Sequence, residues 1–320
     1  MGVTLVTGAT GLLGAHLVRE GLARGQALRV VARTIPRRSF LWSVKEQVDV
    51  RASDLCAEVP ASLLDGVDTV IHAAASSSPG GEDAEAAAAR NVQMVEQLVP
   101  AAARAGVRRW VQISSVATVS GGAQPVDERS TTPRDTPYAK AKRAADLLVA
   151  ARAGVMAVTT LLPTFMLGPF DARPSSGAVF LALRAGVLRH FVDVPKNLVA
   201  AADVARGVWA ALEAGATGPY LLGGADVPLR EFFAEALRLL GLPAGTLEQL
   251  SALPAEGAGE GSDARSFAIV RELCTPSEVR STRAEQAFGY QPTRDPFVAL
   301  REHVEYLSKA RLLRLATPSA

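Results

Sequence analysis

The stretch VTLVTGATGLLG, residues 3–14, joins a short β-branched run to a helical pattern through a turn that contains three glycines. The run predicts a buried strand, and the apolar residues after it predict a helix over Gly11–Ala23. A turn without side chains at the start of a helix leaves backbone N–H groups open to an anion, and the helix dipole favours negative charge there. We therefore expect Gly8, Gly11 and Gly14 to cradle the pyrophosphate of a dinucleotide.

Short β-branched runs alternate with alanine-rich helical stretches through the first half of the chain. This alternation is typical of a parallel sheet with helices on both faces. The expected strands are Val3–Val6, Leu28–Ala32, Thr69–His72, Trp110–Ile113 and Ala157–Leu162, and the expected helices are Gly11–Ala23, Ala84–Ala105 and Tyr138–Ala153. The sequence predicts an α/β fold with a Rossmann-type doubly wound parallel sheet.

The alternation breaks after Pro163, where Gly168-Pro169 and a turn at 175–177 precede a short helical stretch. We expect residues 1–163 plus about 196–222 to form the dinucleotide-binding domain, with a strand and helix over Asn197–Ala214 rejoining the main sheet. Residues from about 164–195 and 223–320 then form a smaller C-terminal α/β substrate-binding lobe. The segment Gly241–Gly261, rich in Gly, Ala and Pro, predicts a mobile loop or lid.

Charge and cysteine content exclude several classes of function. The 320 residues carry 34 Lys and Arg against 32 Asp and Glu, a balance that argues against nucleic acid as a partner. The two cysteines and four histidines are scattered, so neither a disulfide framework nor a metal site is expected. The scattered cysteines suit a reducing cytoplasm. Because no stretch of about 18 residues is free of charges and glycines, we expect a soluble protein with no membrane contact.

The second expected strand ends at Arg33, about twenty residues past the glycine turn. Enzymes that use NAD place an acidic residue there to bind the ribose hydroxyls, whereas a guanidinium suits the additional 2′-phosphate of NADP. NADP(H) is therefore the favoured cofactor. A solvated basic loop is the alternative interpretation of Arg33, so NAD(H) stays open.

Tyr138 and Lys142 lie four residues apart at the start of an expected helix, so their side chains share one face. Ser115 follows the strand Trp110–Ile113, at the edge of the sheet where open α/β folds bind ligands. A nearby ammonium lowers the pKa of a tyrosine, and a serine hydroxyl can hold a substrate oxygen in line for proton transfer. The three residues predict a Ser-Tyr-Lys catalytic group, with Ser114 as the alternative serine.

Taken in order along the chain, these motifs resemble the extended short-chain dehydrogenase/reductase family, of the NAD-dependent epimerase/dehydratase type. The resemblance rests on residues 7–14, Ser53-Asp54-Leu55, Val70–Ala75, Asn91-Val92, Tyr138–Lys142 and Pro163–Pro169. Within the family, residues 113–119 and 197–207 are most similar to the dihydroflavonol-reductase-like group, which includes the hopanoid-associated sugar epimerase-like proteins.

The resemblance implies a set of cofactor contacts. These are Gly8, Thr10, Gly11, Leu12, Leu13, Gly14, Arg33, Asp54, Leu55, Ala73, Ala74, Ala75, Asn91, Lys142, Pro163 and Phe165. It also implies a homodimer in which the helices Ala84–Ala105 and Tyr138–Ala153 pack against their copies.

Three functions are compatible with these residues. The favoured one is an NADP(H)-dependent carbonyl reductase or alcohol dehydrogenase that acts on a small carbonyl, alcohol or sugar-type substrate. The second is an epimerase of sugar nucleotides, which Arg33 disfavours, and the third is a dinucleotide sensor without catalysis, which the presence of Tyr138 and Lys142 disfavours. Dehydration is also disfavoured, because Val116-Ala117 stands where dehydratases of the family carry Asp-Glu. Expected substrate-lining residues are Phe165, Met166 and Phe170, with Phe180 and His190 as further candidates.

Overall fold

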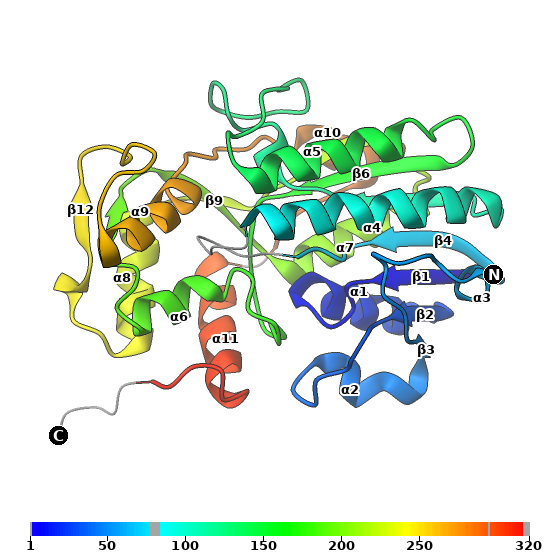
Figure 1. Cartoon of the computed structure of the whole chain (residues 1–320), viewed down its shortest axis with the longest axis horizontal. Coiled ribbons are helices and arrows are strands. Elements are labelled where there is room, and N and C mark those ends of the chain that lie inside the picture. Colours follow the sequence, from blue (N-terminus) through cyan, green and yellow to red (C-terminus); the bar gives the residue numbers. More distant parts are fainter. Residues whose placement is uncertain (1, 77–83, 294, 316–320) are drawn as a thin grey trace.

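A computed structural model describes residues 2–76, 84–293 and 295–315 of the chain (Figure 1). Its largest element is a seven-stranded sheet in the order β10-β6-β5-β4-β1-β2-β3, in which every neighbouring pair is parallel. The strands are β1 Val3–Thr7, β2 Leu28–Val31, β3 Asp49–Arg51, β4 Val67–His72, β5 Arg109–Ile113, β6 Ala157–Pro163 and β10 Gly218–Leu222. The predicted doubly wound fold is confirmed.

Helices cover both faces of this sheet. On one face, α1 Leu12–Ala23 packs beside α7 Ala201–Glu213, and on the other α4 Ala84–Arg104 packs beside α5 Pro137–Ala150. Each face has its own apolar core, the first around Leu17 and Val208 and the second around Leu98 and Val149. Short helices α2 Phe40–Val44 and α3 Ala61–Leu64 and the 3₁₀ turns η1 Lys45–Gln47 and η2 Val116–Thr118 complete this part. Because β1 lies between β4 and β2, the order of the strands reverses beside β1, and ligands of open α/β sheets bind at the carboxyl ends of strands at such a point.

The smaller lobe is built around two small sheets. The first contains β7 Phe165–Leu167, β9 Pro195–Ala200 and β11 Ala225–Pro228, and the second pairs β8 His190–Val192 with β12 Glu248–Leu250. Its helices are α6 Ala178–Arg184, α8 Leu229–Leu240, α9 Gly261–Leu273 and α11 Pro296–Lys309, with η3 Ala244–Thr246 after α8. Phe180, Phe232 and Leu300 are fully buried in a separate apolar core between them.

Three segments lie differently from the sequence-based expectation. Strand β9 does not rejoin the main sheet but pairs with β7 and β11, while α7, directly after it, does pack on the main sheet. Helix α10 Thr282–Phe288, expected in the lobe, packs against α7 and β10. The expected loop at 241–261 contains β12, which pairs with β8. Local sequence patterns do not specify which partner a short strand or helix finds, because the contacts come from distant segments.

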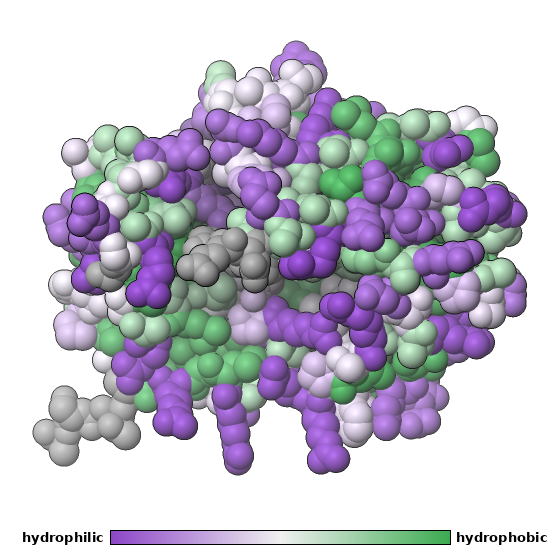
Figure 2. Space-filling view, in the orientation of Figure 1, coloured by the Kyte–Doolittle hydropathy of each residue, from purple (hydrophilic) through white to green (hydrophobic). Residues whose placement is uncertain are grey.

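Two observations concern the described residues as a whole. None of their helices is long and apolar enough to cross a membrane. Near the C-terminal end of α5, Leu147 is 57% exposed and Leu148 is 37% exposed. The space-filling view shows hydrophobic side chains around that end of the helix (Figure 2). The homodimer stays a prediction, and these two leucines lie on one of the helices that it would bury.

Candidate active site

The glycine turn lies where β1 and β4 come together. Gly8 has a φ of +73°, and a Cβ atom on it would lie 2.7 Å from the backbone of Ala73. A Cβ atom on Gly14 would lie 2.0 Å from the carbonyl oxygen of Gly8. Thr7 further ties the two strands together, since its hydroxyl accepts a 3.0 Å hydrogen bond from the Ala74 N–H. The turn is therefore packed against β4 and α1, and only Gly11, whose Cβ would have one neighbour at 3.4 Å, faces open space.

A cavity of about 590 Å³ opens above this turn, along the carboxyl ends of the strands. Thirteen of the predicted cofactor residues line it: Gly8, Thr10, Gly11, Leu12, Leu13, Gly14, Arg33, Asp54, Leu55, Ala73, Ala74, Ala75 and Lys142. A dinucleotide pyrophosphate fits here for two reasons. The turn lacks the side chains that would otherwise fill the space, and it lies at the N-terminus of a helix. Asn91 and Phe165 line the neighbouring cavity instead, and Pro163 is among the lining residues of neither.

Arginines gather at the far end of this cavity. Arg33 is 64% exposed, and its Nη1 lies 3.9 Å from Oδ2 of Asp54, the residue expected at the adenine. Arg173, which the sequence analysis did not identify, reaches over from the smaller lobe, lines the same cavity and donates a 3.0 Å hydrogen bond to Oγ1 of Thr34. No local motif marks Arg173, because it follows a turn in another part of the chain.

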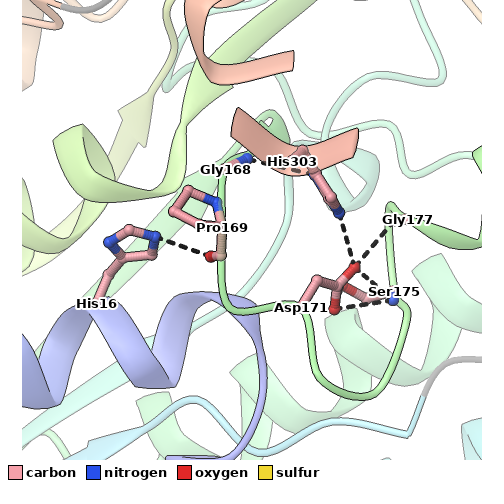
Figure 3. Close-up of polar contacts among 7 residues, drawn as sticks. All are labelled: His16, Gly168, Pro169, Asp171, Ser175, Gly177 and His303. Atoms are coloured by element: carbon pink, nitrogen blue, oxygen red, sulfur yellow. Dashed lines mark hydrogen bonds and ion pairs between the residues drawn. The ribbon is translucent and has the colours of Figure 1, made fainter. Parts of the chain in front are cut away.

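The loop that carries Arg173 is held by a buried carboxylate (Figure 3). Asp171 is fully buried and accepts hydrogen bonds from the N–H groups of Ser175 and Gly177, at 2.9 Å and 3.0 Å. His303 of α11 accepts from the Gly168 N–H through Nδ1, so its Nε2 carries a proton and donates to Asp171 across 3.2 Å. The loop is thereby fixed to α11 at the rim of the cofactor cavity.

A second cavity, of about 270 Å³, lies between the sheet and the smaller lobe. Apolar side chains from both parts line much of it, including Ala88, Phe165, Met166, Val179 and Ile269. Of the residues that the structure describes, four line both cavities: Ser76, Tyr138, Met166 and Ser175. The phenol of Tyr138 therefore lies where the two cavities join.

Ser115 is the serine that accompanies Tyr138. It begins the η2 turn, where its hydroxyl accepts from the Ala117 N–H at 3.2 Å, and it lines the second cavity beside Tyr138, where it acts to lower the pKa of the phenol. Ser114 is buried and turned away, donating to Asp146 Oδ2 at 2.5 Å. Between the two serines that the sequence left open, the geometry places Ser115 at the phenol.

The electrostatics of Tyr138 differ from the expectation. Burial raises the pKa of Tyr138 to about 12, against the lowering by Ser115 and by the charge of Arg134. Lys142 was expected to lower the pKa of Tyr138, but the pKa is raised instead. A phenol with this pKa is protonated at neutral pH, which suits it to give a proton rather than to take one.

Lys142 is buried within α5, and its ammonium donates a 3.0 Å hydrogen bond to the Ile113 carbonyl at the end of β5. Burial lowers the pKa of Lys142 to about 8, against the opposing charge of Asp146. An ammonium in this position holds the end of β5 beside α5, next to the serine turn.

The lowered pKa of Lys142 predicts a pH-dependent stability difference. Between pH 8 and the ordinary lysine value of 10.5 the unfolded chain binds the proton better, so this residue makes the native protein more stable as the pH rises. The free energy of unfolding of native protein, compared with that of Lys142→Met, should therefore rise by on the order of 1–3 kcal/mol across that pH range. Urea unfolding at a series of pH values measures this. The exposed Lys140→Met serves as control, and a difference that stays constant with pH would refute the assignment.

Three of the expected substrate residues lie outside the cavity. Phe170 packs among the rings of His16, Phe40 and Tyr306. Phe180 is buried in the core of the lobe, where its ring contacts Phe232. His190 hydrogen-bonds Ser266 Oγ at 3.0 Å. Aromatic residues next to a predicted site are suitable for packing as well as for binding, and at these three positions their side chains contact neighbouring residues of the protein instead of lining the cavity.

Asn91 of α4 is buried and has a structural contact of its own. Its side chain accepts a 2.6 Å hydrogen bond from the Ser76 N–H and donates one of 3.0 Å to the Ser76 carbonyl. Since Ser76 lines both cavities, Asn91 positions the chain at their junction.

Charged residues that the sequence analysis did not identify line the second cavity. They are Arg134, Lys196 and Glu272, from the segment before α5, from β9 and from α9. They are far apart in the sequence, so no spacing could have brought them together. Among the described residues, no group of three or more His, Cys, Asp or Glu side chains could hold a metal ion.

Comparison with known proteins gives the relatives of this chain. It is 31% identical over 252 residues to a Synechocystis sp. protein provisionally named dihydroflavonol 4-reductase, covering 75% of this chain and 73% of that one. It is 32% identical over 259 residues to sterol demethylase protein B of Methylococcus capsulatus, covering 75% of each. The fold is shared with DesIV, the dTDP-glucose 4,6-dehydratase of Streptomyces venezuelae, with a TM-score of 0.78, 23% identity and coverage of 97% and 98%.

The model of one protein family matches residues 4–223, which include the glycine turn, the Ser115–Tyr138–Lys142 group and strands β1 to β10. The family implies a nicotinamide dinucleotide as cofactor, which fits the cradle and the cavity above it. The chain belongs to the NAD dependent epimerase/dehydratase family.

Proposed function

We propose that this protein is an NADP(H)-dependent carbonyl reductase, or alcohol dehydrogenase in the reverse direction, with Ser115, Tyr138 and Lys142 as its catalytic group. The position of Tyr138, between the predicted cofactor cavity and a largely apolar second cavity, carries the proposal. The reductase name of the Synechocystis relative supports it.

A bound reduced nicotinamide would supply the hydride that this reduction needs. Tyr138 donates its phenolic proton to the carbonyl oxygen, which becomes a hydroxyl. The hydroxyl of Ser115, which lines the same cavity as the phenol, holds the same oxygen in line. The ammonium of Lys142, charged below a pH of about 8, favours the phenolate that remains.

The substrate that we propose has a large apolar body. The apolar side chains of the second cavity, Phe165, Met166, Val179 and Ile269 among them, favour hydrocarbon over the diphosphate of a sugar nucleotide. The names of two relatives, which refer to a dihydroflavonol and to a sterol, point to the same kind of compound.

A panel of cyclic and aryl ketones with NADPH tests the proposal, with oxidation of the cofactor followed by absorbance at its nicotinamide band. We expect turnover of apolar ketones and none of dTDP- or UDP-sugars. Cofactor that stays bound through purification, together with epimerised sugar nucleotide and no net oxidation, would instead establish the epimerase alternative.

The preference for NADP over NAD is proposed to depend on Arg33. Replacing it by serine removes a guanidinium from the end of the cavity where the 2′-phosphate would lie, and charge-assisted pairs with phosphate are strong. We expect Arg33→Ser to weaken NADPH binding by on the order of ten- to a hundred-fold and to leave NADH binding nearly unchanged.

Fluorescence titration with the two reduced cofactors measures both affinities. Arg173→Ser, from the opposite side of the same cavity, should weaken NADPH binding less, since Arg173 also hydrogen-bonds Thr34. Exposed Arg104 at the end of α4 is the control position. Equal losses for NADPH and NADH in Arg33→Ser would contradict the assignment.

A further inference from the structure

The second cavity contains a carboxyl group that the proposed reaction does not use. Glu272 lies in the last turn of α9 and lines the cavity together with Ile269 and Leu273 of the same helix. A negative charge there opposes the helix dipole, whose C-terminal end is itself negative. A residue that is locally unfavourable and turned into a cavity calls for an explanation beyond folding.

The two cations nearby are already engaged by the backbone. Lys196 donates to the carbonyls of Leu273 and Thr275, at 2.6 Å and 3.2 Å. Arg134 donates to Ser120 Oγ at 2.7 Å and to the carbonyls of Glu272 and Pro276, both at 3.4 Å. Both side chains therefore cap the C-terminal end of α9, which explains their burial.

The carboxyl group of Glu272 has no such partner. Within residues 2–76, 84–293 and 295–315 its side chain makes neither a hydrogen bond nor an ion pair, and the residue is half-buried in the wall of the cavity. Burial raises the pKa of Glu272, against the lowering by the charges of Lys196 and Arg134. A carboxylate accepts hydrogen bonds through both oxygens, and on a cavity wall where no protein group uses them they are available to a ligand.

Glu272 and Tyr138 face the same cavity, and the charge of Glu272 acts on the Tyr138 phenol. A molecule whose carbonyl oxygen lies at Tyr138 therefore extends along apolar walls toward Glu272. We infer that Glu272 is a specificity-determining residue that accepts a hydrogen bond from a hydroxyl group of the substrate, so that the preferred substrate is an apolar ketone with a hydroxyl at its far end.

This inference rests on the proposed reductase function and adds the substrate class. A hydrogen bond to a charged group discriminates by on the order of ten- to a hundred-fold between a ligand that has the donor and one that lacks it. The hydroxyl must therefore matter for affinity and for kcat/KM, and its effect must disappear when the carboxyl group does.

The probes are pairs of methyl ketones of increasing chain length, each with and without a terminal hydroxyl, so that one length matches the distance from Tyr138 to Glu272. With NADPH, native protein should prefer the hydroxylated member at that length by ten-fold or more in kcat/KM. Glu272→Leu should bring the ratio close to one, and Glu272→Gln, which keeps an acceptor oxygen, should retain part of it. Glu260→Gln, exposed at the start of the same helix, should keep the native ratio.

A binding measurement separates this inference from the proposed function. The same pairs are titrated calorimetrically into Tyr138→Phe saturated with NADP⁺, with and without Glu272→Leu. A hydroxyl preference that Glu272→Leu removes supports the inference even if native protein reduces no ketone, a result that would reject only the reductase. No preference at any length, or an equal loss for both members of a pair in Glu272→Leu, overturns the inference.

Discussion

Tyr138→Phe is expected to lower kcat for ketone reduction by about a thousand-fold or more while the protein keeps its fold and its affinity for NADPH. The substitution removes only the phenolic oxygen of Tyr138, the residue that lines both cavities and shares the second one with Ser115. General acid catalysis contributes about 10²–10⁴-fold to rates, and among the described residues that line both cavities Tyr138 is the one with a titratable side chain. Single-turnover kinetics with NADPH and an apolar ketone measure the loss.

The pH dependence of the reduction rate is a second part of this prediction. Because burial raises the pKa of Tyr138 to about 12, the phenol stays protonated through the neutral range, and reduction should not fall with loss of its proton there. Tyr220→Phe is the matched control, since Tyr220 is a buried tyrosine of β10 away from both cavities, and it should react as native protein does. Full activity in Tyr138→Phe would reject the proposed catalytic group.

Gly14→Ala is expected to weaken binding of NADPH and NADH alike by more than ten-fold and to lower stability by about 1–3 kcal/mol. The added Cβ atom would lie 2.0 Å from the Gly8 carbonyl oxygen and 2.8 Å from the Ala9 Cα, which are backbone atoms that move only with the whole turn. A shifted turn no longer directs its N–H groups at the pyrophosphate. Titration of both cofactors and thermal unfolding measure the two effects.

Two other glycines provide comparisons for this variant. Gly154 has no atom within 4 Å of an added Cβ, so Gly154→Ala should leave binding and stability as they are. Gly11 meets one atom at 3.4 Å and lines the cofactor cavity, so Gly11→Ala should fold normally and still bind the cofactors more weakly. If Gly14→Ala bound both cofactors normally, the turn would not be the cradle.

Much of the fold could be predicted because its signals are local. The five expected strands and three expected helices of the first half agree with β1, β2, β4, β5, β6, α1, α4 and α5 to within a few residues. Strands in a doubly wound sheet are buried on both faces, so each one is a continuous apolar run that needs no partner to be recognised. The short strands β7, β8, β11 and β12 carry no such run, since each contributes three or four residues to a small sheet.

The residues that line the predicted cofactor cavity could also be found from the sequence, because they come from turns that directly follow strands. The substrate side was not. Phe170 and Phe180 were expected to line the cavity but pack elsewhere, whereas Arg134, Lys196 and Glu272 line it without any motif. A cavity between two lobes is lined by segments whose proximity depends on how the lobes dock, and spacing along the chain says nothing about that.

Tyr138 and Lys142 show where the boundary lies. A spacing of four residues in a helix puts both side chains on one face, so the sequence by itself determined their pairing. It also determined the glycine cradle and the doubly wound sheet. Only the tertiary structure decided that Ser115 rather than Ser114 meets the phenol, that burial raises the pKa of Tyr138, and that Glu272 shares its cavity. Covalent spacing sets the first group of features, whereas desolvation and contacts between distant segments, which exist only once the chain has packed, set the second.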